Sequence, residues 1–170
     1  MAYPLREPAD AEVGGPPRVP APTPGDRAAP AAGLRLRLEL DVPSEVRFIE
    51  RIVAMVQREC VSFAFPARHC ALNVPVALSE ALSNAILRGN RNRPGAQLWV
   101  RACIDERELV LEVEDEGEGF DLDACVNDPA DPRNLEREDG RGLFLMRALM
   151  DRVEQFRGRG NVVRLTLRRP

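Results

Sequence analysis

The sequence predicts an α+β fold, a two-layer sandwich in which a sheet carries helices on one face. Residues 34–40 alternate strictly between apolar and charged side chains, two helical patterns lie between about residues 44 and 87, and further strand patterns flank a short third helix. A period of two is typical of a strand with one buried face, and apolar residues three or four apart are typical of a helix with one buried face. With 170 residues and a 44% hydrophobic fraction, the chain can form one compact domain.

The first 33 residues are dominated by Pro, Ala and Gly. They hold too few large apolar side chains to offset the conformational entropy that ordering would cost. We therefore predict a disordered leader at residues 1–33 and an ordered domain at residues 34–170.

Two helices are expected after the first strand. Ser44 follows Pro43 and is a suitable N-cap for a helix that runs to about Ser62. The second helix is expected at about residues 73–87, with Pro75 in its first turn, where a missing N–H costs little.

The second half of the chain reads as a hairpin, a loop, a helix and two more strands. Strands are expected at residues 97–104 and 108–114, joined by a polar segment. Residues 121–139 are polar, contain two prolines and are expected to form a mobile loop. A short helix at about residues 142–151 is followed by strands at 152–157 and 162–168, separated by the turn residues 158–161.

Charge and composition exclude several functions. The net charge of −3 and the pI near 5.4 argue against direct binding of nucleic acid, which needs a basic excess. Every basic residue is Arg, so neither a Schiff base nor a P-loop lysine is available. We find no apolar run of about 20 residues and no signal peptide, and therefore expect a cytoplasmic protein without membrane contact.

The four cysteines form no CxxC pair, and His69 is the single histidine that could join them. A zinc site needs closely spaced Cys and His ligands, so this pattern favours buried free thiols. The cysteines are Cys60, Cys70, Cys103 and Cys125.

The first motif that carries chemistry is the segment at residues 80–85 on the second helix. Glu80 and Asn84 are four residues apart, so their side chains project from one face. Mg²⁺ prefers oxygen ligands, and a carboxylate beside it can accept a proton. Taken alone, this spacing is equally typical of a solvated helix face.

The second and third motifs are rich in glycine. Asp115 precedes Gly117 and Gly119 directly after a strand, where the backbone can approach a ligand and the carboxylate can accept a hydrogen bond from an amino group such as that of adenine. Each motif alone has a simpler explanation, as a β-turn or as a helix N-terminus. The third motif, Gly140, Arg141 and Gly142, leads into a helix whose free N–H groups and dipole suit a phosphate.

Together and in this order, the three motifs resemble the N box, the DxGxG box and the GxGLxL box of the GHKL ATPases. The resemblance covers roughly residues 34–170 and implies the Bergerat ATP-binding fold, with a mixed, mostly antiparallel sheet. The run at residues 80–86 and the pattern at residues 142–151 are most similar to the anti-sigma-factor serine/threonine kinases of the RsbW and SpoIIAB type.

This resemblance implies a kinase that binds ATP and Mg²⁺, sequesters a sigma factor and phosphorylates a Ser or Thr of a STAS-type anti-anti-sigma protein. By position, Glu80 is the expected general base, Asn84 the Mg²⁺ ligand and Asp115 the adenine contact. Gly117 and Gly119 are expected to make room for the nucleotide. Gly140, Arg141 and Gly142 are expected to hold the phosphates, and a homodimer is implied as usual for the family.

Two alternatives remain beside this interpretation. A histidine kinase needs a helical dimerisation segment with a phosphoacceptor His; His69 lacks the expected acidic neighbour and leaves no room upstream for such a segment. The stronger alternative is a regulatory module that binds nucleotide and sequesters a partner without phosphoryl transfer. The family often has His and Gly shortly after the N-box Asn, whereas this chain has Arg88 and Gly89, and Arg88 could instead reach a phosphate or an acidic group.

Overall fold

The computed structural model describes residues 35–119 and 141–170. The described strands form one antiparallel sheet in the order β1-β2-β3-β5-β4. The strands are β1 (Leu36–Pro43), β2 (Gln97–Ile104), β3 (Glu108–Asp115), β4 (Arg152–Arg157) and β5 (Asn161–Arg168). The α+β fold class is confirmed, and the hairpin of β2 and β3 forms as predicted.

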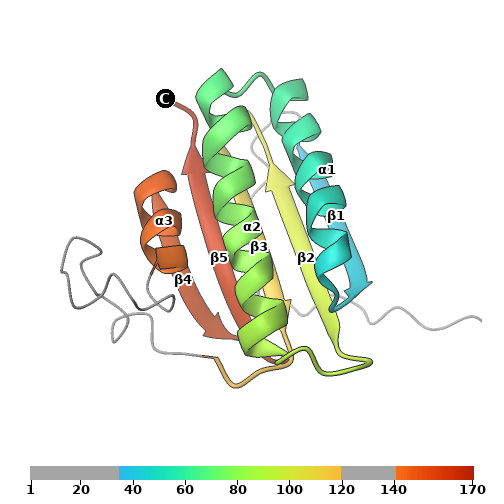
Figure 1. Cartoon of the computed structure of the whole chain (residues 1–170). Helices are drawn as coiled ribbons and strands as arrows, with labels where there is room; N and C mark the ends of the chain where they lie inside the picture. The colour runs from blue at the N-terminus through green and yellow to red at the C-terminus, as the bar shows by residue number, and fades with distance from the viewer. Residues whose placement is uncertain (1–34, 120–140) are drawn as a thin grey trace, which may run out of the picture. The chain divides into compact units, whose positions relative to one another are not determined.

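The described helices lie on one face of this sheet (Figure 1). A short 3-10 turn, η1 (Val46–Phe48), leads into α1 (Ile49–Ser62), and α2 (Val74–Asn84) is flanked by two wide π-helical turns, η2 (His69–Asn73) and η3 (Ala85–Gly89). The third helix is α3 (Arg141–Leu149), which packs beside α2. The two-layer arrangement places α2 in the middle of the helical layer (Figure 1).

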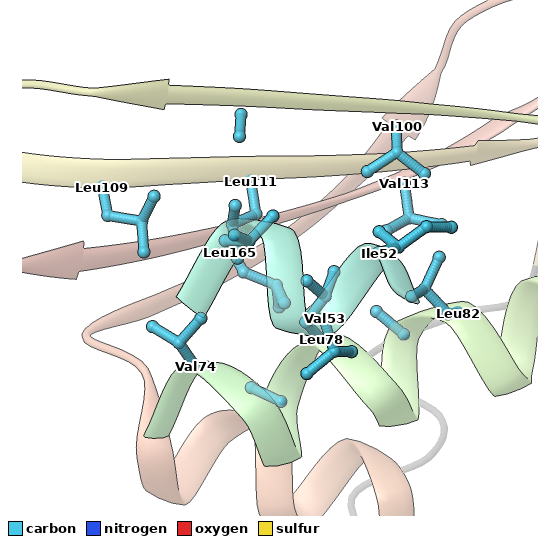
Figure 2. Close-up of a cluster of buried hydrophobic side chains, with 14 of the residues drawn as sticks. Ile52, Val53, Val74, Leu78, Leu82, Val100, Leu109, Leu111, Val113 and Leu165 are labelled. Atoms are coloured by element: carbon cyan, nitrogen blue, oxygen red, sulfur yellow. The ribbon is translucent and has the colours of Figure 1, made fainter. Parts of the chain in front are cut away.

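The core lies between the two layers. It is formed by the apolar side chains that recur with the strand and helix periods predicted from the sequence. Strand β2 alternates between half-buried and buried residues along its whole length, as a strand with one covered face should. Figure 2 shows a cluster of these side chains between the helices and the sheet. It includes Ile52, Val53, Val74, Leu78, Leu82, Val100, Leu109, Leu111, Val113 and Leu165.

The prediction that Ser44 caps the first helix is wrong. The residue before the 3-10 turn is Glu45, and no side chain caps it. The Ser44 hydroxyl instead accepts a hydrogen bond of 2.9 Å from Asn90 Nδ2, and the Ser44 side chain is buried by this contact. The Ser44 side chain therefore binds Asn90, directly after the second helical run, instead of a backbone N–H at the start of the first helix.

The second helical segment begins earlier than predicted. The N–H of Val74 donates to the carbonyl of His69, five residues back, so the helix is widened directly before Pro75. Such π-turns occur where the regular ladder is interrupted. Because of this wide turn, the helical run is continuous from His69 to Gly89 and Pro75 lies within it.

The helical run His69–Gly89 is also long and apolar enough to cross a membrane by length and composition, with a mean hydropathy of 1.3. In the structure, its apolar residues Val74, Leu78 and Leu82 are fully buried against the core. The sequence analysis had found no apolar run of about 20 residues, whereas this helical run is 21 residues long. Its most deeply buried apolar side chains belong to the core.

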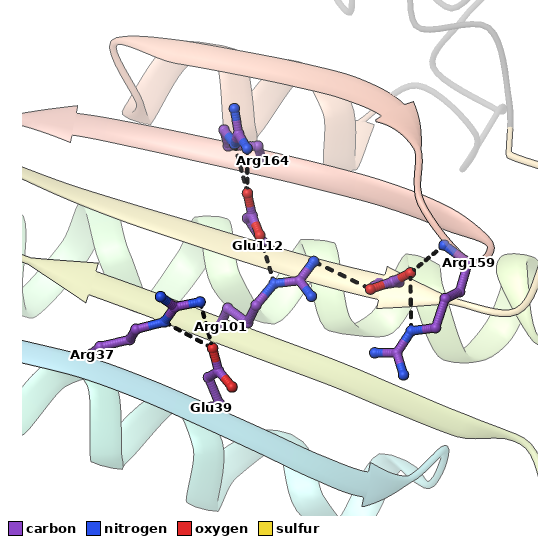
Figure 3. Close-up of polar contacts among 7 residues, drawn as sticks. Arg37, Glu39, Arg101, Glu112, Arg159 and Arg164 are labelled. Atoms are coloured by element: carbon purple, nitrogen blue, oxygen red, sulfur yellow. Dashed lines mark hydrogen bonds and ion pairs between the residues drawn. The ribbon is translucent and has the colours of Figure 1, made fainter. Parts of the chain in front are cut away.

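The face of the sheet opposite the helices carries a row of ion pairs (Figure 3). Arg101 bonds to Glu112 at 2.7 Å and to Glu114 at 3.2 Å, and Arg164 bonds to Glu112 from the other side. Arg159 stacks over the Trp99 ring, with its guanidinium carbon 4.0 Å from the ring centroid. These contacts tie β2, β3 and β5 together across that face.

The predicted leader at residues 1–33 and the whole predicted loop at residues 121–139 lie outside the described residues, as do Gly140 and Cys125. The three other cysteines are free thiols: Cys60 and Cys70 are buried, as expected, whereas Cys103 is half-buried.

Candidate functional site

The structure brings the first and third motifs together. Glu80 and Asn84 lie one turn apart on α2, both half-buried, and face the start of α3. A β-carbon built on Gly142 would lie 2.5 Å from Glu80 Oε2 and 3.4 Å from Asn84 Nδ2. A larger residue at this position would displace the Glu80 carboxylate, so Gly142 is what leaves that carboxylate in its position.

The second motif surrounds a buried carboxylate at the end of β3. Asp115 is 1% exposed. Its Oδ1 accepts a 2.7 Å hydrogen bond from the Gly117 N–H, and its Oδ2 accepts a 3.0 Å hydrogen bond from Asn161 Nδ2. Burial raises the pKa of Asp115 above its usual value, because desolvation outweighs the two hydrogen bonds that favour the charged form.

The end of the α2 helical run reaches this same carboxylate. A β-carbon on Gly89 would lie 2.3 to 2.5 Å from the three carboxyl atoms of Asp115, and one on Gly117 would lie 2.7 Å from the Gly89 carbonyl oxygen. Two glycines from distant segments thus make room for Asp115. The sequence analysis noted Gly89 as a family position without expecting this contact.

Asn161 is a site residue that the sequence analysis missed, since it was assigned to the turn before β5. It pairs with Asp115 in the sheet register and donates to the Asp115 side chain. Gln155 Nε2 in turn donates to Asn161 Oδ1 at 2.5 Å. The pairing of β3 with β5 places Asn161 opposite Asp115. No local sequence pattern shows which residues of two distant strands pair, so Asn161 could not be identified from the sequence.

Gly119 has a positive φ of 85°, a backbone conformation that favours glycine. A β-carbon there would lie 2.6 Å from Gln155 Nε2 and 2.7 Å from Asn161 Oδ1. Gly119 therefore lets the chain pass close to Gln155 and Asn161, the polar groups around Asp115.

The remaining predicted site residues lie at the start of α3. Arg141 is exposed and is the first residue of this helix. Gly142 follows it and meets Glu80, whereas Gly140 lies outside the described residues. An exposed arginine at a helix N-terminus adds a positive charge to the positive end of the helix dipole.

The two clusters lie along one helical run. Glu80 and Gly89 are nine residues apart, which corresponds to about 13 Å of helix. The buried acceptor Asp115 lies beside Gly89, at the C-terminal end of this run, and the oxygen-bearing side chains Glu80 and Asn84 lie nine and five residues before Gly89. This separation suits an extended ligand with an amino group at one end and negative charge at the other.

The described residues contain no group of three or more His, Cys, Asp or Glu side chains that could hold a metal ion by themselves. Mg²⁺ is usually held by one or two protein oxygens together with substrate phosphates and water. Glu80 and Asn84, with the space kept open by Gly142, fit a cation held in this shared way.

The fold is that of a domain of the nucleotide-binding ATPase class, with one polar cluster on α2 and another around Asp115 at the end of β3. Residues 42–167 match the family described as histidine kinase-like ATPase domain, which is most of the chain. The chain belongs to this family.

Its relatives include two anti-sigma F factors. That of Thermoanaerobacter sp. (strain X514) is 33% identical over 97 residues, which cover 55% of this chain and 67% of the relative. That of Clostridium acetobutylicum is 37% identical over 95 residues, covering 54% and 65%. The serine-protein kinase RsbW of Bacillus subtilis (strain 168) is 31% identical over 99 residues, covering 55% and 62%.

These matches confirm the resemblance that the three motifs predicted. The chain spans about two thirds of the length of these relatives. The names anti-sigma F factor and serine-protein kinase RsbW are those of the relatives.

Proposed function

We propose that this protein is an ATP-dependent protein kinase and anti-sigma factor. In this proposal it binds a sigma factor and phosphorylates a Ser or Thr of a STAS-type antagonist in the cytoplasm. The names of its relatives support both parts of the role. The observation that carries the catalytic part is the position of Glu80, held opposite Gly142 and one turn from Asn84.

The Asp115 cluster is the proposed adenine pocket. A carboxylate has about four lone-pair positions, and the protein uses two of those of Asp115 through Gly117 and Asn161. The remaining positions can accept from the exocyclic amino group of adenine. Side chains at Gly89 and Gly117 would collide with the Asp115 carboxyl group, and one at Gly119 would meet Gln155 and Asn161, so these glycines leave the proposed acceptor and its partners in place.

Asn84 is the proposed Mg²⁺ ligand, and Gly140, Arg141 and Gly142 are the proposed phosphate contacts. When bound, Mg²⁺ neutralises charge on the phosphates. Backbone N–H groups at the start of α3 and the Arg141 guanidinium would orient the terminal phosphate. Positioning and charge neutralisation supply most of the catalysis in this class of reaction.

Glu80 is the proposed general base. It would take the proton from the attacking hydroxyl of the antagonist protein and orient that oxygen towards the terminal phosphate. Its side chain is half-buried and faces Gly142 at the start of α3. An incoming side chain can therefore reach it without unfolding either helix.

The test is transfer of labelled γ-phosphate from Mg-ATP to a STAS-domain protein, with the parent compared with Glu80→Gln. The kinase proposal expects transfer to fall by about 100-fold or more in the variant, while ATP affinity in calorimetry changes little. Glu118→Gln is the matched control, because Glu118 is exposed at the rim of the second motif, and it should transfer normally.

A parent protein that binds ATP but transfers no phosphate would favour the alternative, a module that sequesters its partner without catalysis. Failure of the parent to bind ATP would contradict both versions. Size-exclusion chromatography with light scattering checks the homodimer that the family resemblance implies.

A further inference from the structure

Two buried thiols are in contact at the junction between α1 and the second helical run, His69–Gly89. Cys60 is in the last turn of α1, and Cys70 is the second residue of the wide turn η2. Their sulfur atoms are 3.1 Å apart, and the two residues are 0% and 4% exposed. Cys70 Sγ also lies 3.5 Å from the Phe65 carbonyl oxygen.

The two sulfur atoms are only slightly farther apart than the sulfurs of a disulfide bond. A disulfide has an S–S distance of about 2.0 Å, so the two sulfurs need to approach by only about 1 Å. Rotation about the two Cα–Cβ bonds and a small shift of the α1 end can supply this movement. Neither thiol belongs to the proposed nucleotide site.

We propose that Cys60 and Cys70 form a reversible disulfide that links the end of α1 to the first turn of the second helical run. This goes beyond the proposed kinase function and does not depend on it. The site would respond to hydrogen peroxide or to another small thiol oxidant.

The reaction with peroxide balances without a further reactant. One thiolate attacks a peroxide oxygen, the O–O bond breaks, and a sulfenic acid forms with release of water. The second thiol, deprotonated as it attacks, displaces the sulfenic oxygen as a second water and forms the S–S bond. Two thiols are thereby oxidised by two electrons, and one hydrogen peroxide is reduced to two waters.

The surroundings of the pair set the rate of this reaction. Burial raises the pKa of Cys60 to about 12, and the neighbouring Cys70 thiol adds to the shift. Because the thiolate is the reactive form, oxidation of the closed fold is slow at neutral pH. Local opening of residues 63–68 would expose the pair, so the rate should increase with pH and with mild denaturant.

The disulfide would close the loop between α1 and the second helical run. Glu80 lies ten residues beyond Cys70, about 15 Å further along the helix. We therefore expect oxidation to raise the melting temperature by roughly 5–10 °C and to leave ATP affinity unchanged within twofold.

Trypsin provides a direct test, because the chain contains no Lys and Arg68 lies between the two cysteines. The full chain is treated with hydrogen peroxide, unfolded in the presence of N-ethylmaleimide and digested without reductant. The proposal expects peptides 59–68 and 69–88 to appear joined by a bond that dithiothreitol removes. Cys70→Ala should lose both the joined peptide and the thermal shift, and Cys103→Ala should keep both.

Three results would overturn the proposal. The first is that both cysteines are still alkylated in full after peroxide treatment, also in mild denaturant. The second is oxidation of each sulfur separately to sulfinic acid. The third is a disulfide from Cys60 or Cys70 to Cys103 or Cys125 in place of the bond between them.

Discussion

Glu114 and Asp115 are neighbours in β3, are 2% and 1% exposed, and point to opposite faces of the sheet. Glu114 Oε1 accepts a 2.6 Å hydrogen bond from the backbone N–H of Arg159, and Asp115 Oδ2 accepts one from Asn161. Figure 3 shows the contacts of Arg159 on the open face. The turn between β4 and β5 is thus held from both faces of the sheet.

Asp115→Asn should separate nucleotide binding from stability. Loss of an ionised acceptor is expected to weaken ATP binding by about tenfold or more. The apo fold should keep its stability or gain some, because burying this carboxylate raises its pKa and therefore costs free energy in the charged form. Isothermal titration calorimetry and thermal melts at neutral pH measure the two effects.

Asp105→Asn is the matched control for that substitution. Burial tends to raise the pKa of Asp105, but hydrogen bonds from the Arg107 and Glu108 N–H groups and the charge of Arg35 hold it below its usual value. The variant should therefore lose some stability and bind ATP normally. An Asp115→Asn variant with unchanged affinity would place the adenine contact elsewhere.

The raised pKa of Asp115 also predicts a pH dependence. A carboxyl group with a folded pKa above its unfolded value favours folding at low pH and loses this contribution as the pH rises through the folded pKa. Over the same interval the carboxylate forms, so ATP binding should strengthen while this part of the stability declines. Binding that does not weaken at acid pH in the parent protein would contradict the assigned role.

Glu114 should act on the nucleotide site through the turn that it holds. Glu114→Ala removes the acceptor of the Arg159 N–H and one of the two partners of Arg101, and should cost about 2–3 kcal/mol in the free energy of unfolding. Glu114→Gln keeps one acceptor oxygen, so it should restore part of the stability. Because Asn161 follows the same turn, ATP affinity should decrease in the same order, as urea titrations and calorimetry would show.

Glu112 should contribute to stability at neutral pH. Burial alone would raise its pKa, but hydrogen bonds from Arg164 and Arg101 more than offset this and hold the pKa below its usual value. A depressed carboxyl pKa stabilises the fold above the unfolded pKa, about 4.3, and this contribution is lost as the pH falls through the folded pKa. Glu112→Gln should therefore lower stability at pH 7 and lose less on acidification below about pH 5.

Glu39→Gln is the control for Glu112. Its partner Arg37 is in the same strand, and the two side chains are 71% (Arg37) and 56% (Glu39) exposed. Exposed pairs contribute about 0–1 kcal/mol, so this variant should follow the parent at every pH. Equal pH profiles for the two variants would show that the Arg101–Glu112–Arg164 row does not stabilise the sheet.

Periodicity predicted the strands and the general place of the helices, because one-sided burial leaves a repeating pattern. Strand β2 was predicted with the bounds that it has in the structure, Gln97–Ile104. The contacts that were missed join segments far apart in the chain. The Ser44 hydroxyl is bound by Asn90, 46 residues away, and Asp115 is bound by Asn161, also 46 residues away.

For the motifs too, local patterns identified the residues, but not all of the contacts between distant segments. Glu80, Asn84 and Gly142 were named from local patterns, and the structure places Gly142 against the other two. Gly89 was not recognised as part of the Asp115 cluster, because its requirement for glycine arises from a carboxylate in another strand. A local pattern identifies which side chains can act, whereas the register decides which neighbours they have.

Gly142→Ala tests whether the position of Glu80 matters for transfer. The added β-carbon would lie 2.5 Å from Glu80 Oε2, the far end of a flexible side chain, which can move away. Alanine is also the better helix former, by about 1 kcal/mol, so the fold should persist. We expect γ-phosphate transfer to decrease by about tenfold or more, since displacement of a positioned group by about 1 Å is costly, with a smaller change in ATP affinity.

Gly89→Ala provides the contrast, because its β-carbon would meet the Asp115 carboxyl group at 2.3 to 2.5 Å. That carboxyl group is fixed by Gly117 and Asn161, so it cannot move away without losing hydrogen bonds. This variant should therefore lose ATP binding and stability together. If Gly142→Ala behaved in the same way, the α2–α3 contact would serve nucleotide binding in general, and the separate role of Glu80 in proton transfer would lose its structural support.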